Sequence, residues 1–393
     1  MKILYVVNNA AFFCSHRLPV ALAARQAGHE VALLTGQPGS ATMEAPALER
    51  LRQLGVTHQA TAFRSGGVAP WSEGLGLLQA IAFMRRWKPD LVHCASPKGV
   101  LYGGLAARLT RCAALVLAVS GMGSLFTRPR GGIGVGALAR RAYLLVARLA
   151  YGHRNARVIV QNHDDQRLIV ENELAGEDHI TLIPGSGVAL QQYAATPWAA
   201  RQNLVVLPGR LLRDKGVLEF VAAARQLRQA GCDWRFALVG TADYDNPTAI
   251  PPAQVQAWVD EGCIEWWGHR DDMGAVYAQA RIVCLPSYRE GMPKVLLEAA
   301  AAGCAVVTTD AVGCREAVLP AVTGDLVPVA DAPALTAALR ALIEDPARQA
   351  AYGARGRELA SERFSLDAVI DRTLDCYAQL AGAAAGTTRT GRA

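Results

Sequence analysis

Short apolar runs alternate with longer helical segments along most of the chain, and this alternation constrains the fold more than any other feature. In the first half, the runs are rich in Val, Ile and Leu, and the segments between them carry Ala, Leu and Arg at helical spacing. The runs lie at 3–7, 31–34, 91–94, 114–119, 158–160 and 180–183. Continuous apolar runs of this length are typical of strands that are buried on both faces of a parallel sheet. The first half is therefore predicted to be a doubly wound α/β domain.

The alternation is interrupted once and then starts again. The segment 183–188, with one Pro and two Gly, breaks the pattern, and apolar runs return at 204–207, 236–239, 264–267, 282–285, 305–308 and 326–327. Two Rossmann-like domains, residues 1–185 and 186–365, are therefore predicted to face each other across a cleft that suits a ligand. We expect a terminal helix over 366–380 to pack back on the first domain. The Ala-, Gly- and Thr-rich segment 381–393 is expected to be a disordered tail.

Composition excludes several classes of protein. With 51% hydrophobic and 19% charged residues over 393 positions, the chain is expected to be globular rather than disordered. No apolar run approaches the roughly 18–20 residues that span a bilayer. The nine Cys are odd in number and lie mostly in apolar runs, which favours reduced core residues of a cytoplasmic protein over a disulfide framework.

The charge is distributed unevenly. Residues 1–163 carry 19 Lys/Arg against 5 Asp/Glu, whereas residues 164–393 carry 21 against 29. No acidic residue lies between Asp90 and Asp164. This asymmetry indicates an anionic partner for the first half, either nucleic acid or anionic lipid, unless the basic surface is simply solvated.

Several familiar chemical motifs are absent. Val7 leads into Asn8 and Asn9 without a glycine-rich loop, which argues against a nicotinamide dehydrogenase. The sequence has no P-loop, no zinc-binding H-E-x-x-H or C-x-x-C pattern, and no G-x-S-x-G nucleophile motif. Asp243-Tyr244-Asp245 resembles a metal-binding D-x-D, but the following Asn-Pro favours a turn. No metal site is predicted.

The segment 285–303 predicts an anion site. The run 282–285 leads into a turn and then a helix that is expected to begin near residues 291–293, where Gly allows close backbone approach and Pro suits a first helical turn. Unpaired N–H groups at the positive end of a helix suit a phosphate. The residues expected around that phosphate are Gly291, Met292, Pro293, Lys294 and Val295.

Two carboxylates flank this site. Glu290 precedes the helix and Glu298 follows eight residues later, about two turns down the same face. So placed, they could grip hydroxyls on both sides of a phosphate, a sugar on one side and a ribose on the other. Alternatively, both are ordinary surface residues.

A second segment supplies cations. The run 204–207 is followed by Gly209, Arg210, Arg213 and Lys215, at the carboxyl end of the first strand of the second domain. Arg210 and Lys215 could reach a diphosphate and neutralise the charge that develops on a departing nucleoside diphosphate. The alternative is that Lys215 pairs with Asp214 or Glu219 on the surface.

Together these segments resemble the retaining glycosyltransferases of family 4, which have the GT-B fold. Glu290 and Glu298 match that family's E-x7-E motif, and Arg210 and Lys215 match its phosphate-binding cations. The resemblance implies a nucleotide-sugar donor, usually a UDP-sugar, held mainly by the C-terminal domain. It also implies transfer without metal or other cofactor, with the first Glu on the donor sugar and the second on the ribose.

The finer pattern is similar to enzymes that build bacterial surface polysaccharides, such as O-antigen, capsule or exopolysaccharide, on a polyprenyl-diphosphate carrier. Residues 12–19, 96–99, 268–273 and 309–316 carry this similarity. One departure is Ser120-Gly121-Met122-Gly123, where many members have a His that touches the donor sugar. The acceptor side is expected to include Ser15, His16, Arg17, Lys98 and Ser120.

No pair of residues suggests a nucleophile with its base, so the sequence favours front-face substitution. A donor phosphate oxygen takes the acceptor proton while Arg210 and Lys215 stabilise the leaving diphosphate, with Glu290 on the sugar. A lipid-linked acceptor would explain the basic first half. The segment 125–154, with arginines around apolar residues, could lie on the anionic inner face of the cell membrane, or residues 138–149 could form a core-facing helix.

Two other classes of function remain as alternatives. A sugar-nucleotide epimerase or hydrolase could share this architecture, but it needs acid and base groups that converge on the sugar. A nucleic-acid-binding protein would account for the basic half and not for Glu290 and Glu298.

Overall fold

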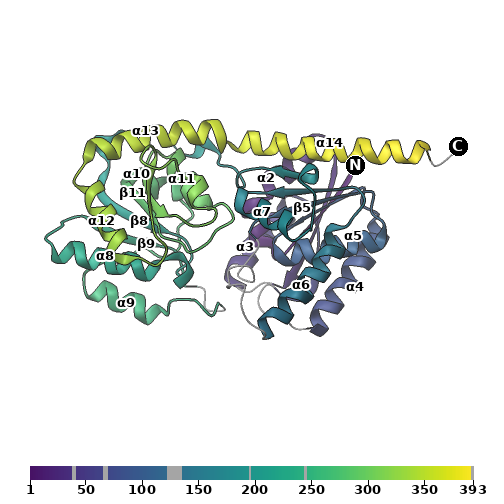
Figure 1. The fold of residues 1–393 in the computed structure, drawn as a ribbon, viewed down its shortest axis with the longest axis horizontal. Coiled ribbons are helices and arrows are strands. Elements are labelled where there is room, and N and C mark those ends of the chain that lie inside the picture. The colour runs from purple at the N-terminus through teal and green to yellow at the C-terminus, as the bar shows by residue number, and fades with distance from the viewer. Residues whose placement is uncertain (38–40, 65–69, 122–134, 194–195, 243–245, 391–393) are drawn as a thin grey trace. The chain divides into compact units, whose positions relative to one another are not determined.

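The structure is a computed structural model that describes residues 1–37, 41–64, 70–121, 135–193, 196–242 and 246–390. Its contacts divide the chain into two units (Figure 1). Unit 1 comprises residues 1–183 and 369–393, and unit 2 comprises residues 184–368.

Unit 1 is built on a seven-stranded sheet in which every strand pair is parallel. Its strands are β1 (Lys2–Val7), β2 (Glu30–Gln37), β3 (Thr57–Arg64), β4 (Leu91–Ala95), β5 (Ala114–Val119), β6 (Ala156–Val160) and β7 (Ile180–Leu182). The order is β3-β2-β1-β4-β5-β6-β7, so the winding reverses between β1 and β4. Such a reversal is where doubly wound sheets bind ligands.

Helices cover both faces of this sheet. Alternate residues of β1 enter two separate cores, with Leu4 in one and Tyr5 in the other. The core around Leu4 includes side chains of α4 (Pro70–Trp87), α5 (Gly104–Thr110), α6 (Val135–Tyr151) and α7 (His163–Glu171). The core around Tyr5 includes side chains of α1 (Ala10–His16), α2 (Leu18–Gln26), α3 (Ala41–Gln53) and the C-terminal helix α14 (Leu366–Thr390).

Unit 2 repeats the architecture with six parallel strands. They are β8 (Gln202–Pro208), β9 (Arg235–Val239), β10 (Glu265–Trp266), β11 (Ala280–Leu285), β12 (Ala305–Thr309) and β13 (Gly324–Val327). The order β10-β9-β8-β11-β12-β13 reverses between β8 and β11. The predicted pair of doubly wound parallel sheets is therefore confirmed.

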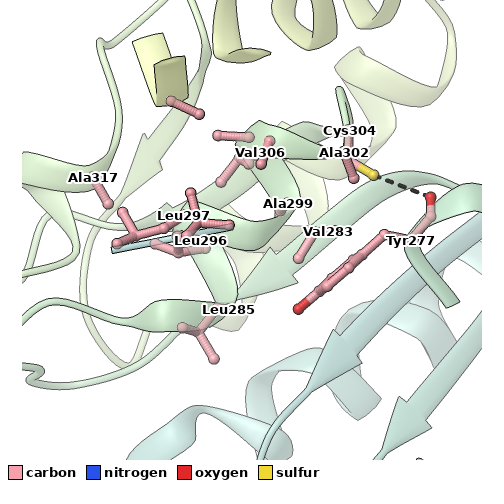
Figure 2. Packing of buried hydrophobic residues seen from close by; sticks show 14 of the residues in the cluster. Tyr277, Val283, Leu285, Leu296, Leu297, Ala299, Ala302, Cys304, Val306 and Ala317 are labelled. Atoms are coloured by element: carbon pink, nitrogen blue, oxygen red, sulfur yellow. Dashed lines mark hydrogen bonds between the residues drawn. The ribbon is translucent and has the colours of Figure 1, made fainter. Parts of the chain in front are cut away.

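The helices of unit 2 also pack in two groups. One core contains side chains of α8 (Val217–Gln229), α9 (Pro252–Asp260) and α12 (Ala332–Ile343). The other contains side chains of α10 (Met273–Gln279), α11 (Lys294–Ala301) and α13 (Pro346–Arg363). Leu296 and Leu297 of α11 lie in this second core with Leu285, Val306 and Ala317 (Figure 2).

The structure differs from the sequence-based expectation in two elements. The strand β3 has no counterpart among the predicted runs, because it lies at the edge of the sheet and buries only Thr61 and Phe63. The segment from residue 381 was expected to be disordered. Instead, α14 continues to Thr390; residues 391–393 lie outside the described part of the chain.

A network of buried hydroxyl groups joins α14 to the sheet of unit 1. The Tyr377 hydroxyl lies 2.9 Å from the Tyr5 hydroxyl and 2.7 Å from His93 Nδ1. All three side chains are buried. Burial, followed by the nearby Arg17 charge, lowers the pKa of His93 well below 6.5, so the imidazole is neutral in the folded protein.

A neutral buried histidine makes unit 1 sensitive to acid. The unfolded chain takes up a proton at His93 near pH 6.5 and the folded chain does not, so the free energy of unfolding decreases as the pH falls below that value. We expect His93→Gln to reduce this decrease by up to about 1.4 kcal/mol per pH unit, measured by urea unfolding between about pH 7.5 and 5.5. The exposed His179 is the control, and His179→Gln should follow the wild type; equal slopes for all three proteins would contradict the prediction.

Candidate functional site

Three loops follow the carboxyl ends of neighbouring strands where the winding of unit 2 reverses. They are residues 209–216 after β8, 286–293 after β11 and 310–315 after β12. Since β8 and β11 pair directly, as do β11 and β12, all three loops lie at one edge of the sheet. Both candidate cations and the first candidate phosphate-binding residues belong to these loops.

Hydrogen bonds hold the middle loop to its two neighbours. On one side, the Tyr288 N–H and the Ser287 Oγ lie 2.9 and 3.0 Å from the Asp214 carbonyl oxygen. On the other side, Thr309 Oγ1 donates to the Ser287 carbonyl. The loop after β11 therefore has a defined position before any ligand is considered.

Two glycines permit the close contacts between these loops. Gly216 has φ +72°, and a Cβ at this position would overlap the Pro286 carbonyl oxygen. Gly313 has φ +78°, and its Cβ would lie 2.5 Å from the Gly291 carbonyl oxygen. No side chain fits between the loops at either point, so a larger residue would force them apart.

An ion pair joins the first two loops. Lys215 Nζ donates to Glu290 Oε1, and the two side chains are only 20% and 13% exposed. Ser287 Oγ lies 2.7 Å from the same carboxylate oxygen. The surface partners considered from the sequence are engaged elsewhere: Glu219 accepts from Tyr288, and Asp214 lies near Thr248. The structure therefore brings together Lys215 and Glu290, which lie 75 positions apart.

Cys314 lies close to this pair. Burial, followed by the Glu290 charge, raises the pKa of Cys314 to about 12. Its thiol is therefore neutral at physiological pH, and it does not serve as a thiolate nucleophile.

Helix α11 begins at Lys294, slightly later than the sequence predicts. Its N-cap residue is Pro293, whose side chain cannot accept a hydrogen bond from the first turn. Pro293 thus supplies no side-chain cap, and the backbone donors of the first turn follow directly after Gly291 and Met292. A helix N-terminus a few residues after the glutamate of a Lys–Glu pair suits an anion chemically.

Glu298 lies about one turn down from this N-terminus and is held by Lys294 and by two tyrosines that the sequence did not predict. Tyr277 donates to its Oε2 over 3.0 Å, and Lys294 Nζ lies 3.5 Å from Oε1. Tyr193 also bonds to Glu298, and burial followed by this carboxylate raises the pKa of both tyrosines. The local sequence around residues 193 and 277 gave no signal that their hydroxyls meet one carboxylate.

Two further candidates of unit 2, Gly209 and Arg210, lie at the start of the loop after β8. Gly209 has φ +139°, and a Cβ there would have no atom within 4 Å. Arg210 follows directly and is exposed. Arg210 thus belongs to the same loop as Lys215.

The candidate acceptor-side residues of unit 1 fall into two groups. Ser15 is exposed, and His16 and Ser120 are half-buried. Arg17 is 5% exposed, and its guanidinium lies inside the unit near Tyr5 and Tyr377. This burial lowers the pKa of Arg17. Lys98 pairs with the buried Glu73 over 2.5 Å. The structure therefore presents Ser15 to solvent and engages Arg17 and Lys98 internally.

In unit 1, the helix N-terminus that follows β1 is already filled. Glu44 accepts hydrogen bonds from the Ala10 and Ala11 N–H groups over 2.8 and 3.1 Å, and the Asn9 side chain caps the same helix. A carboxylate from the protein itself occupies the place where an anion would bind. Of these two helix ends, the one in unit 2 suits an anion and the one in unit 1 does not.

Other predictions concern residues with partial or no description. Asp243-Tyr244-Asp245 and residues 122–134 lie outside the described part of the chain. Over the described residues, no group of three or more His, Cys, Asp or Glu could hold a metal ion. Among the same residues, no helix is both long and apolar enough to cross a membrane.

Comparison with protein families gives two matches that cover most of the chain. Residues 16–185 match the family described as glycosyl transferase 4-like domain. Residues 202–345, which contain the whole candidate site of unit 2, match glycosyl transferases group 1.

Relatives with named functions are distant in sequence but align with most of this chain. The chain is 24% identical to N,N'-diacetylbacillosaminyl-diphospho-undecaprenol alpha-1,3-N-acetylgalactosaminyltransferase of Campylobacter jejuni, over 88% of this chain and 90% of the relative. It is 22% identical to the capsular polysaccharide biosynthesis glycosyltransferase CapM of Staphylococcus aureus, over 79% and 82%. Among solved structures, Anabaena HepE in complex with UDP and glucose has a TM-score of 0.75 at 20% identity, covering 96% of this chain and 99% of that one.

The loop contacts yield a test of the site's architecture. Gly216→Ala and Gly231→Ala both place a side chain at positive φ, but Gly231 has no atom within 4 Å of a Cβ. We expect Gly231→Ala to lower the free energy of unfolding by about 1–2 kcal/mol from backbone strain. Gly216→Ala should cost about 1–3 kcal/mol more because of the clash with Pro286, measured by chemical denaturation. Equal losses would show that the close contact is unimportant.

Proposed function

Because the chain belongs to the group 1 glycosyltransferases of family GT4, with the GT-B fold, we propose that unit 2 binds the diphosphate of a UDP-sugar at the loops after β8 and β11. The enzyme is a glycosyltransferase, and its donor site is assigned to Gly209, Arg210, Lys215, Glu290 and the turn 291–295, with Glu298 on the ribose. The observation that carries this assignment is the Lys215–Glu290 ion pair beside the α11 N-terminus. HepE, which shares the fold, has been crystallised with UDP-glucose.

The charges of the site suit a diphosphate leaving group. Lys215 is mostly buried and held by Glu290, so a phosphate that enters the site meets an oriented cation. Arg210 adds a second cation that can bind two phosphate oxygens at once. The first turn of α11 supplies backbone donors. Such preorganised charges stabilise a departing diphosphate more strongly than water does.

Transfer with retention follows from this arrangement without a protein nucleophile. The bond between the sugar anomeric carbon and the diphosphate oxygen breaks, and the acceptor oxygen bonds to the same face of that carbon. The acceptor proton passes to a donor phosphate oxygen, and the electron pair of the broken bond leaves with the nucleoside diphosphate. Glu290 positions the sugar by accepting hydrogen bonds from its hydroxyls.

We propose a polyprenyl-diphosphate-linked saccharide as the acceptor, in the synthesis of a bacterial surface polysaccharide. The Campylobacter relative acts, by its name, on a diphospho-undecaprenol saccharide, and the Staphylococcus relative belongs to capsule synthesis. Residues 1–163, with 19 Lys/Arg and 5 Asp/Glu, suit both an anionic carrier and the anionic inner face of the cell membrane. The enzyme is therefore assigned to the cytoplasmic side of that membrane.

The cations of the site should control turnover. We expect Arg210→Ala and Lys215→Ala each to lower kcat by about two orders of magnitude or more, by analogy with the loss of one oxyanion donor. The exposed Arg228 of α8 provides a matched control, and Arg228→Ala should keep the wild-type rate. Near-normal turnover in both site variants would refute the leaving-group assignment.

Removal of divalent ions provides an independent test. Because Arg210, Lys215 and the α11 N-terminus supply the positive charge, we expect excess EDTA to leave the rate of sugar transfer unchanged within about twofold. A loss of activity that Mg²⁺ or Mn²⁺ restores would show that a metal carries this charge instead.

The function itself is tested by product analysis. A panel of UDP-sugars is incubated with a synthetic polyprenyl-diphosphate saccharide, and the product mass is measured. Addition of one sugar residue from one UDP-sugar is expected. The proposal would be contradicted if, with every acceptor tested, the enzyme only released free sugar or converted the UDP-sugar without transferring it.

A further inference from the structure

Helix α4 exposes an apolar stripe where a surface helix ordinarily exposes polar residues. Trp71, Leu75 and Leu78 are 93%, 51% and 64% exposed, at the i, i+4 and i+7 spacing that places them on one side of the helix. The other exposed residues over the same turns are Pro70, Gly74 and Ala82. None of the exposed residues from Pro70 to Ala82 is polar, and the stripe ends at the exposed Arg85 and Arg86.

Two neighbouring helices also expose large apolar side chains. Helix α5 packs against both α4 and α6, and the three lie together on one side of unit 1 (Figure 1). Leu109 of α5 is 54% exposed, and Leu145 and Leu149 of α6 are 65% and 44% exposed. We call these six residues the α4–α6 face: Trp71, Leu75, Leu78, Leu109, Leu145 and Leu149.

The charges on these three helices are almost all positive. The sequences of α4, α5 and α6 contain a single acidic residue, Glu73, which is buried and paired with Lys98. Exposed basic residues border the apolar ones at Arg85, Arg86, Arg108, Arg111 and Arg141. Arg148 is also exposed and pairs with Glu173.

The combination of exposed apolar side chains and neighbouring arginines favours one kind of partner. Two copies of the same face would bring arginines against arginines, so self-association is disfavoured. Nucleic acid would satisfy the arginines but would leave the Trp and Leu side chains against phosphates. An anionic bilayer satisfies both, because Trp and Leu enter the headgroup region while Arg side chains reach the lipid phosphates.

We propose that the α4–α6 face docks unit 1 on an anionic lipid bilayer, with Trp71, Leu75 and Leu78 as the inserting residues. This deepens the proposed function and rests on its lipid-linked acceptor. Glu73 lies within one turn of Trp71 and contacts Lys98, in the loop after β4. That loop follows a strand at which the winding of unit 1 reverses, so the docked helix begins beside the candidate acceptor side.

Vesicle flotation tests the proposal on the full chain without donor or acceptor. The wild type is expected to bind vesicles that contain about one-third phosphatidylglycerol, and to bind pure phosphatidylcholine vesicles much more weakly. The triple variant Trp71→Gln, Leu75→Gln, Leu78→Gln should bind the anionic vesicles at least about tenfold more weakly. Gln is a good helix former, so α4 is retained. The matched control is Leu218→Gln, an exposed leucine on α8 of unit 2, which should bind as the wild type does.

Two further measurements keep the test independent of misfolding. The triple variant should retain the wild-type thermal shift with UDP, which reports the donor site in unit 2. With brominated lipids, Trp71→Phe should lose part of the fluorescence quenching seen in the wild type, because Trp71 enters the headgroup region. If the Trp71→Phe variant showed the same fluorescence quenching as the wild type, insertion at this residue would be contradicted.

The outcomes separate this inference from the proposed function. If the enzyme transfers sugar to a short, water-soluble acceptor analogue but the wild type and the triple variant bind anionic vesicles equally, the docking face is wrong and the proposed function stands. If the face binds vesicles as expected but no lipid-linked acceptor receives a sugar, the proposed acceptor fails and the docking surface stands. A dimer in solution that the triple variant dissociates would overturn the lipid assignment.

Discussion

The ion pair between Lys215 and Glu290 is the interaction on which the candidate site depends. It joins loops that follow two strands paired side by side, and Gly216 lets those loops approach closely. Both side chains are mostly buried, where charge–charge attraction is stronger than in water, but their desolvation offsets much of that gain. The pair therefore contributes more to the placement of charge than to stability. In the proposed donor site, this placement brings a fixed cation to the diphosphate.

The two units share a doubly wound topology and differ in electrostatics where their winding reverses. In unit 1 the N-terminus of α1, which follows β1, is filled by Glu44, so its backbone donors are satisfied by the protein. In unit 2 the N-terminus of α11 follows a proline that offers no side-chain acceptor, and the Lys215–Glu290 pair lies just before it. The same architecture thus yields one helix end that a carboxylate of the protein fills and one whose N-cap side chain offers no acceptor. This difference, rather than the fold, supports the proposed placement of the nucleotide diphosphate in unit 2.

Unit 1 differs in a second respect, in what it exposes. Its arginines were visible as a charge asymmetry, but their arrangement around an outward apolar face emerges only from the packing of α4 on β3 and α5. Two of the expected acceptor residues, Arg17 and Lys98, are engaged inside the unit, whereas three large apolar side chains on α4 are exposed. Burial of a cation costs desolvation free energy, and an exposed tryptophan forgoes the free energy of hydrophobic burial. The proposed lipid docking would remove the exposed apolar side chains of α4 from water.

Most of the strands could be predicted from the sequence, because apolar runs buried on both faces of a parallel sheet have a composition that sets them apart from the helices between them. The sequence also located Glu290, Lys215 and the α11 turn, since their residue types and spacing carry the phosphate chemistry directly. Which of these groups meet could not be predicted in this way, because the order of the strands in the sheet brings together Lys215 and Glu290, which are 75 positions apart along the chain. The same holds for the tyrosines that bind Glu298, for the polar edge strand β3, and for which side of α4 faces solvent. Each of these depends on what packs against a residue, and that information lies in distant segments rather than in the local pattern.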